Sequence, residues 1–300
     1  MRLLTYKEDG RHRLAVHAAD GVLDVAAAAA RWPADLTPLT VREAIERGEP
    51  GLAALRSLAD LARSEAFGDA SVWRKEASLA LAACVPDPGK IVCVGLNYRK
   101  HAEETNSPYP ERPILFSKFN NALTAHGSDV VLPAVSTKVD YEAELAIVIG
   151  RRAKNVEPEE ALDYVFGYCN ANDLSARDLQ LRTSQWLLGK TCDGFLPLGP
   201  WLVTADEAGD PNALPVRTTV NGELRQRSDT GDMIFRCDEI VSYISKHFTL
   251  EPGDLILTGT PEGVVMGYPP ERQAYLKDGD IVTVEIGGLG VLTNRLVAGR

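Results

Sequence analysis

The sequence predicts a β-rich α+β protein with a barrel or sandwich core and a small α+β domain in front of it. From residue 90 onward, short runs of strand-forming residues dominate, and Gly and Pro separate them. Helical patterns are few, and they do not alternate with strands as a doubly wound fold requires. The Pro/Gly-containing segment VPDPGK at 85–90 marks a change in composition. We therefore predict domains at 1–85 and 86–300.

The first 85 residues combine strand and helix patterns. The stretches LLTYK, RHRLAVHA and GVLDVA are short, apolar and separated by Gly-containing turns, which is typical of a β-meander. Helices are predicted at about 40–48 and 51–66. Four leucines of the second helix share roughly one face: Leu52, Leu55, Leu58 and Leu61.

The larger part contains β-rich runs such as KIVCVGLN, ILFSKF, YEAELAIVIG, YVFGYCNAND and DLILTGT. Its predicted helices are about 157–164, 176–182 and 237–247. Ser175, with Asp178 three residues later, resembles a capping box and predicts where the second of these helices begins.

Composition restricts the possible partners and the location. The net charge of -10 and the pI of about 5.1 argue against nucleic acid and anionic membranes. Five cysteines without a Cys-x-x-Cys pair predict reduced thiols rather than disulfides or a zinc site. The apolar stretch around the alanine run at 26–30 is shorter than the ~20 residues that a membrane span needs. The start, MRLLTYKEDG, becomes charged too early for a signal peptide, so we expect a soluble cytoplasmic protein.

The segment DYEAELAIVIG at 140–150 carries the strongest functional signal. As a strand it places Glu142 and Glu144 on one face, and both faces continue apolar, so both carboxylates are expected to be buried. Burial of like charges is unfavourable unless a cation balances them, and hard oxygen ligands favour magnesium, manganese or calcium. Asp173, at the end of VFGYCNAND, is a third candidate ligand. Asp140 is a reserve candidate that we expect at the surface. The alternative is that these glutamates reach water or pair with lysines.

Polar residues that follow Asp173 could bind an acidic substrate. Arg177 and Gln180 are three residues apart and share a helix face, and arginine pairs bidentately with carboxylates. An ordinary surface pair explains this spacing equally well. Lys190 lies in the apolar loop WLLGKTCDGF and could stabilise an oxyanion, although a lysine that simply extends to solvent is an alternative.

Two further segments complete the candidate site. His101 and Glu104, in NYRKHAEET, would be neighbours on a helix, where the carboxylate could polarise the imidazole for proton transfer. A solvated polar stretch is the alternative. The turn in LILTGTPEGV, which contains Thr260, could hold an anion through backbone N–H groups and the hydroxyl.

Together these segments resemble the fumarylacetoacetate hydrolase family over roughly 88–296. The markers occur in order: KIVCVGLNYRKHAEE, PILFSK, DYEAELAIVIG, NDLSARDLQ, LGKTCDGFLPLGP, VNGE, DMIF, LEPGDLILTGTPEGV and IGGLG. The resemblance implies a mixed β-roll or barrel core and usually a homodimer. It also implies magnesium, or manganese or calcium in its place, held by Glu142, Glu144 and Asp173. The remaining implied roles are Lys190 beside the substrate oxygens, Arg177, Gln180 and Thr260 around the substrate, and His101 with Glu104 as a water-activating pair on a lid.

The function implied by this resemblance is cleavage of a C–C bond in a small 2-oxo acid. Hydrolysis of an acylpyruvate-type 2,4-dioxo acid is the first expectation. Decarboxylation of oxaloacetate to pyruvate and carbon dioxide is an alternative, as is isomerase, hydratase or decarboxylase chemistry on unsaturated 2-oxo diacids. A non-catalytic module that binds a metal or a 2-oxo acid is the alternative of a different class.

Overall fold

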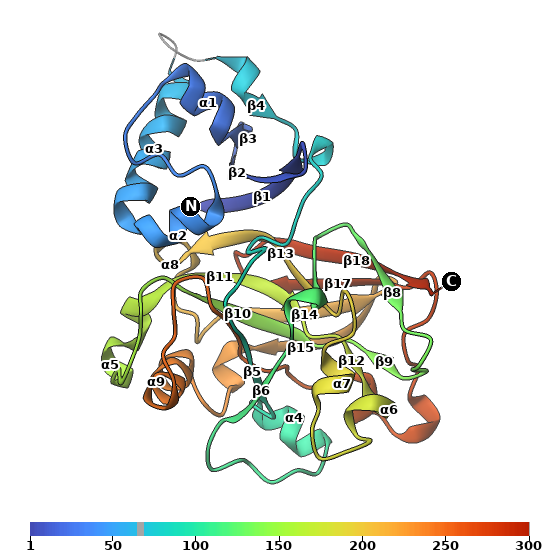
Figure 1. Cartoon of the computed structure of the whole chain (residues 1–300). Coiled ribbons are helices and arrows are strands. Elements are labelled where there is room, and N and C mark those ends of the chain that lie inside the picture. Colours follow the sequence, from blue (N-terminus) through green and yellow to red (C-terminus); the bar gives the residue numbers. More distant parts are fainter. Residues whose placement is uncertain (65–68, 300) are drawn as a thin grey trace.

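The computed structural model describes residues 1–64 and 69–299, and sheets dominate it (Figure 1). The large sheet contains, in spatial order, β4 (Trp73–Arg74), β3 (Gly21–Asp24), β2 (Arg11–Ala18), β1 (Arg2–Glu8), β13 (Leu196–Thr204), β11 (Val165–Asn172), β10 (Ala143–Ile149), β16 (Leu255–Leu257), β5 (Ile91–Gly95) and β6 (Ile114–Ser117), with β7 (Leu123–Thr124) beside β13. A second sheet has the order β15 (Glu223–Asp229), β14 (Pro215–Val220), β17 (Ile281–Ile286), β18 (Val291–Ala298) and β8 (Asp129–Leu132), and β9 (Val139–Asp140) pairs with β12 (Ser175–Ala176). The predicted β-rich α+β class is confirmed.

The N-terminal strands extend the large sheet rather than forming a separate one. β1 pairs antiparallel with β13, so that Arg2 lies opposite Val203. The predicted helices are present as α2 (Val41–Arg47) and α3 (Glu49–Arg63), and the last two residues of the predicted range 51–66 lie outside the described residues. The sequence did not predict α1 (Val25–Arg31), which occupies the alanine run and is capped by the Asp24 carboxylate. The domain boundary at 85/86 stays a prediction.

Helices in the larger part are short apart from α9 (Cys237–His247), which has the predicted bounds. The others are α4 (Arg99–Glu104), α5 (Pro158–Ala161), α6 (Arg177–Gln180), α7 (Leu187–Lys190) and α8 (Ala205–Ala208). The predicted capping by Ser175 is wrong. Ser175 pairs with Asp140 in an extended strand, its hydroxyl donates to the Asp173 carbonyl, and Ala176 precedes α6 without a side-chain cap.

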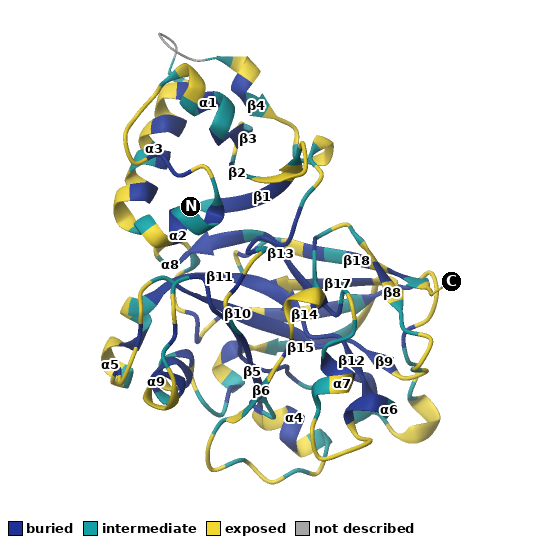
Figure 2. Ribbon diagram, in the orientation of Figure 1, coloured by how far each residue is buried: buried dark blue, intermediate teal, exposed yellow. Residues whose placement is uncertain are grey.

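Strand β10 lies between two apolar clusters and is buried along its whole length, as the sequence predicted (Figure 2). Ala146 and Val148 belong to a cluster that also includes Leu55 of α3. Leu145 and Ile147 belong to another cluster, which includes residues of α9. Any charged side chain at the start of this strand is therefore held in a low-dielectric interior. Nowhere in 1–64 or 69–299 does the chain form a helix of the length and apolarity needed to cross a membrane.

Candidate active site

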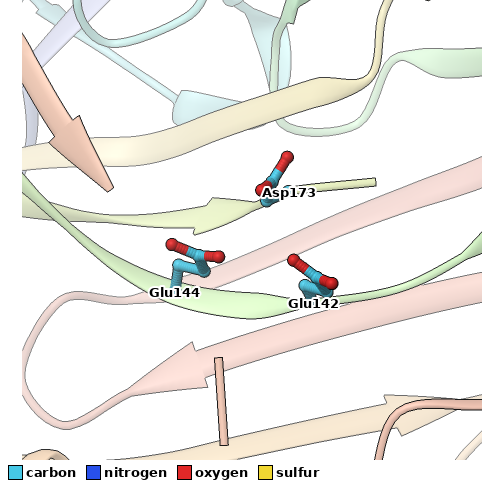
Figure 3. Close-up of side chains that lie close together, drawn as sticks. All are labelled: Glu142, Glu144 and Asp173. Carbon is cyan, nitrogen blue, oxygen red and sulfur yellow. The ribbon is translucent and has the colours of Figure 1, made fainter. Parts of the chain in front are cut away.

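Three carboxylates meet where β10 and β11 lie side by side (Figure 3). Glu142 precedes β10, Glu144 is its second residue, and Asp173 follows β11. The pairing of Ala143 with Asn172 brings the three together, and the Asp173 amide donates to the Glu142 carbonyl. One carboxylate oxygen from each residue lies within 4.8 Å of the others, and all three side chains are buried. The predicted burial of Glu142 and Glu144 is confirmed.

Two buried lysines form ion pairs with this cluster. The Lys190 ammonium donates to Glu142 Oε2 at 2.6 Å and to Asp173 Oδ2 at 2.7 Å. Lys118, which follows β6, donates to Asp173 Oδ1 and to the Leu174 carbonyl. Sequence reasoning missed Lys118, because a lysine at the end of an edge strand normally extends into solvent. Asp173 is consequently held by a lysine on each oxygen.

Arg177 connects the cluster to a fourth carboxylate, Asp140. Its Nε donates to Asp140 Oδ2 at 2.9 Å, and its Nη1 lies 2.7 Å from Glu142 Oε1 and 2.9 Å from Gln180 Oε1. The expectation that Asp140 lies at the surface is wrong. Its side chain is fully buried and also accepts the amide N–H groups of Val265 and Met266. Within the described part of the chain, Arg177 Nη2 is buried without a hydrogen-bond partner, which leaves one donor for a ligand.

The chemistry of this cluster suits a divalent cation. Burial opposes ionisation of Glu142, but Lys190 and Arg177 outweigh it and lower the pKa of this carboxyl. Glu144 differs, because burial and then the charges of Asp173 and Glu142 raise its pKa well above the ordinary value. Across 1–64 and 69–299, the ion pairs include none to Glu144, whose Oε2 accepts only the Gly259 amide N–H, at 2.7 Å. A hard divalent ion would supply the missing positive charge to three oxygen donors.

The predicted pair on α4 is formed. His101 Nδ1 lies 2.7 Å from Glu104 Oε1, and the other oxygen of Glu104 accepts the Gly263 amide N–H at 3.0 Å. This contact favours the tautomer in which Nδ1 carries the proton, because an ionised carboxylate only accepts hydrogen bonds, and in that tautomer Nε2 is the basic nitrogen.

A cavity of about 230 Å³ brings the predicted residues together. Seven of them line it: His101, Glu142, Glu144, Arg177, Gln180, Lys190 and Thr260. Glu104 and Asp173 contact these lining residues from behind. The sequence analysis missed the apolar part of the wall, which includes Ile114, Phe116 and Trp186. The two aromatic rings meet edge to face at 5.3 Å.

The turn after β16 contacts the site through its backbone and through Thr260. The Gly259 amide binds Glu144, as described above. The Thr260 hydroxyl accepts a hydrogen bond from Gln226 Nε2 at 2.9 Å and lines the cavity. This turn was expected to hold an anion, and the anionic group that it binds within the chain is the carboxylate of Glu144.

The fold and this cluster match one family. The family model for the C-terminal part of fumarylacetoacetate (FAA) hydrolase matches residues 90–297. The chain belongs to the fumarylacetoacetate hydrolase family, and it is an enzyme.

The names of individual similar proteins show which activities occur among its relatives. A relative from Xenopus laevis, named mitochondrial oxaloacetate tautomerase fahd2, is 43% identical over 268 residues, which cover 87% of this chain and 79% of the relative. The structure of fumarylacetoacetate hydrolase from Exiguobacterium antarcticum has a TM-score of 0.81 and 36% identity, with all of both chains covered. Maleylpyruvate hydrolase from Sphingobium sp. SYK-6, solved with manganese(II) and pyruvate, has a TM-score of 0.78 and 30% identity over all of both chains.

Proposed function

We propose that this protein interconverts the keto and enol forms of oxaloacetate in a magnesium-dependent reaction, with manganese or calcium able to substitute. One observation carries the proposal: a basic imidazole, a buried lysine and an arginine with a free donor converge on the three-carboxylate cluster in one cavity. The name of the Xenopus laevis relative supports oxaloacetate as the substrate.

Glu142, Glu144 and Asp173 would hold the metal. When bound, the ion would act as a Lewis acid that polarises the 2-oxo group and makes the C3 protons more acidic. A magnesium ion prefers six oxygen ligands, so three carboxylates leave positions for the substrate.

The chain's own residues supply binding and proton transfer. The free Nη2 of Arg177 is the donor for a substrate carboxylate. His101 Nε2 takes a proton from C3, while Glu104 holds Nδ1 and stabilises the imidazolium. The C3–H electron pair moves into the C2–C3 bond and the C2 oxygen becomes negative, where the Lys190 ammonium stabilises it. Return of the proton to that oxygen completes the tautomerisation.

A second candidate function is hydrolysis of an acylpyruvate. The apolar wall that includes Phe116 and Trp186 favours it, because oxaloacetate has no apolar group to place there. In this reaction His101 takes a proton from water, the hydroxide attacks C4, and the bond from C4 to C3 breaks. The leaving pyruvate enolate is stabilised as in the first reaction.

The test compares the reactions on one preparation with magnesium. Decay of enol-oxaloacetate absorbance reports tautomerisation, pyruvate release reports decarboxylation, and acetylpyruvate and fumarylpyruvate report hydrolysis. We expect the first rate to exceed the uncatalysed rate most strongly. A chelator should abolish the catalysed rate, and added magnesium should restore it. In Glu142→Gln the catalysed rate should be absent even with magnesium present. Enol decay at the uncatalysed rate with magnesium present would contradict the proposal.

We also propose a cytoplasmic homodimer that acts on a small 2-oxo acid without a nucleic-acid or membrane partner. The net charge of -10 supports the absence of polyanionic partners. The Xenopus laevis relative is named mitochondrial, so cell fractionation is the deciding measurement for location. Light scattering of the purified protein decides the oligomeric state.

A further inference from the structure

The segment from Gly259 to Gly267 binds three carboxylates of the site through four of its backbone amides. The Gly259 amide donates to Glu144, and the Gly263 amide donates to Glu104. The amides of Val265 and Met266 both donate to Asp140, which also holds Arg177. One short segment thereby contacts the proposed metal site, the proton-transfer pair and the anchor of the substrate arginine.

Gly267, the last residue of this segment, lies next to the Glu104 carboxylate. A Cβ atom at position 267 would lie 2.5 Å from both Cδ and Oε2 of Glu104, and 2.7 Å from Oε1. Non-bonded carbon and oxygen atoms essentially never come closer than 3.0 Å, so a side chain at 267 would displace the carboxylate. Asp140 fixes the two preceding amides, which limits how far Gly267 can move away.

We propose that Gly267 is a positioning residue: the absence of its side chain lets Glu104 reach His101 and so sets the tautomer of the imidazole. Only the expected loss of kcat rests on the proposed function; the effect on the tautomer does not. One oxygen of Glu104 lies 2.7 Å from His101 Nδ1, and the other accepts the Gly263 amide N–H. With Glu104 displaced, Nδ1 loses its acceptor, and the imidazole is free to adopt the Nε2–H tautomer, which cannot accept a proton at Nε2.

The cost of the change should fall on catalysis more than on stability. The atoms that a methyl group would meet belong to the end of a side chain that is part-exposed, with a relative accessibility of 21%. That carboxylate can rotate toward solvent without disturbing the core. The three atoms nearest to the added methyl group all belong to Glu104 and none to Glu142, Glu144 or Asp173, so we expect metal binding to be unchanged.

The experiment compares Gly267→Ala with Gly89→Ala in the full-length protein. Gly89→Ala is the matched control, because its methyl group would meet a carboxylate oxygen of Asp254 at 2.9 Å, outside the cavity. For Gly267→Ala we expect kcat on oxaloacetate to fall about 100-fold, the lower end of what positioned acid–base catalysis contributes. KM, the metal dissociation constant and Tm should stay near the wild-type values. The control should keep the wild-type kcat, KM and metal dissociation constant, while its Tm should fall, because the Asp254 side chain that it meets is fully buried.

A double-mutant cycle identifies the cause. In a Glu104→Ala background, Gly267→Ala should have no further effect on kcat, because the carboxylate that it displaces is absent. Equal losses in both backgrounds would overturn the inference. The cycle also covers the case in which Gly267→Ala alone folds poorly, since the Glu104→Ala background removes the clash and should restore the Tm.

Nitrogen-15 spectra of the histidine rings separate this inference from the proposed function. We expect the His101 signals, assigned by their loss in His101→Ala, to show Nδ1–H in the wild type and a shift toward Nε2–H in Gly267→Ala. Unchanged ring signals would overturn the inference whatever the enzyme's substrate. A wild type without oxaloacetate turnover but with the expected ring shifts would contradict the proposed function and leave the inference standing.

Discussion

Glu144→Gln tests whether a cation balances the one cluster carboxylate that lacks a basic partner in the described structure. Glutamine keeps nearly the same volume and still offers an oxygen to the Gly259 amide, which lies 2.7 Å from the carboxylate. The change removes only the charge. Asp173 and Glu142 then no longer face a third carboxylate within 4.8 Å, so the metal-free variant should be at least as stable as the metal-free wild type.

The expected size of the metal effect follows from linkage. A ligand that binds only the folded state adds about 2.7 kcal/mol to the free energy of unfolding at a concentration of 100 times its Kd. For a chain of this length that corresponds to a Tm increase of roughly 4 °C. We expect this increase for the wild type in magnesium or manganese relative to chelator. Glu144→Gln should gain less than about 2 °C at the same concentration, because a charged ligand is lost.

Differential scanning calorimetry in chelator and across a metal titration provides the measurement. Glu46→Gln is the matched control, because Glu46 lies exposed on α2 and outside the cluster. A metal-dependent Tm increase of the same size in Glu144→Gln and in the wild type would refute the assignment of Glu144 as a ligand. A wild type whose Tm does not respond to either metal would refute the metal site as a whole.

Other substitutions test the remaining parts of the site. His101→Ala should lower kcat about 100-fold or more without changing the metal Kd, as steady-state kinetics and a metal titration would show; an unchanged kcat would mean that another group transfers the proton. Arg177→Lys should raise KM about tenfold to a hundredfold, because a compact ammonium lacks the planar fork of the guanidinium, which holds Asp140 through Nε and keeps Nη2 for the substrate; a kcat effect alone would contradict substrate binding by Arg177. Lys118→Met should destabilise the metal-free protein by about 3 kcal/mol in denaturant unfolding, because it leaves one oxygen of buried Asp173 without its cation; a change below about 0.5 kcal/mol would contradict that pairing.

Local patterns in the sequence were enough to predict the central features. The alternation in 140–150 placed Glu142 and Glu144 on one face, and an apolar context on both faces implied burial, as the structure shows. The spacing of His101 and Glu104 predicted their contact, because residues three apart on a helix are neighbours. These inferences succeed because the strand and helix periods determine which side chains share a face, and only a few neighbouring residues are needed to recognise those periods.

Other features depend on pairings between distant segments and could not be predicted in this way. Asp140 resembles a polar residue at the entry of a strand, yet Arg177 and the amides after residue 264 surround it. The buried Lys118 ammonium has its partners in Asp173 and the Leu174 carbonyl, which lie 55 and 56 residues further along the chain. Ser175 has the spacing of a helix cap, but pairing with Asp140 keeps it extended. In each case a partner more than thirty residues away decides the environment.

The balance of charge at the site explains how an acidic protein can attract an acidic substrate. Three buried lysine and arginine side chains occur in 1–64 and 69–299, and all three are at this site: Lys118, Arg177 and Lys190. They face four buried carboxylates, those of Asp140, Glu142, Glu144 and Asp173. With all seven groups ionised, the site carries one net negative charge and repels a 2-oxo acid, as does the chain's overall charge of -10. A divalent cation would reverse the sign locally to one net positive charge, and it would do so inside a cavity whose apolar wall strengthens electrostatic attraction. On this reasoning the metal's first effect is to make binding of an anionic substrate favourable, before any effect on the bond that reacts.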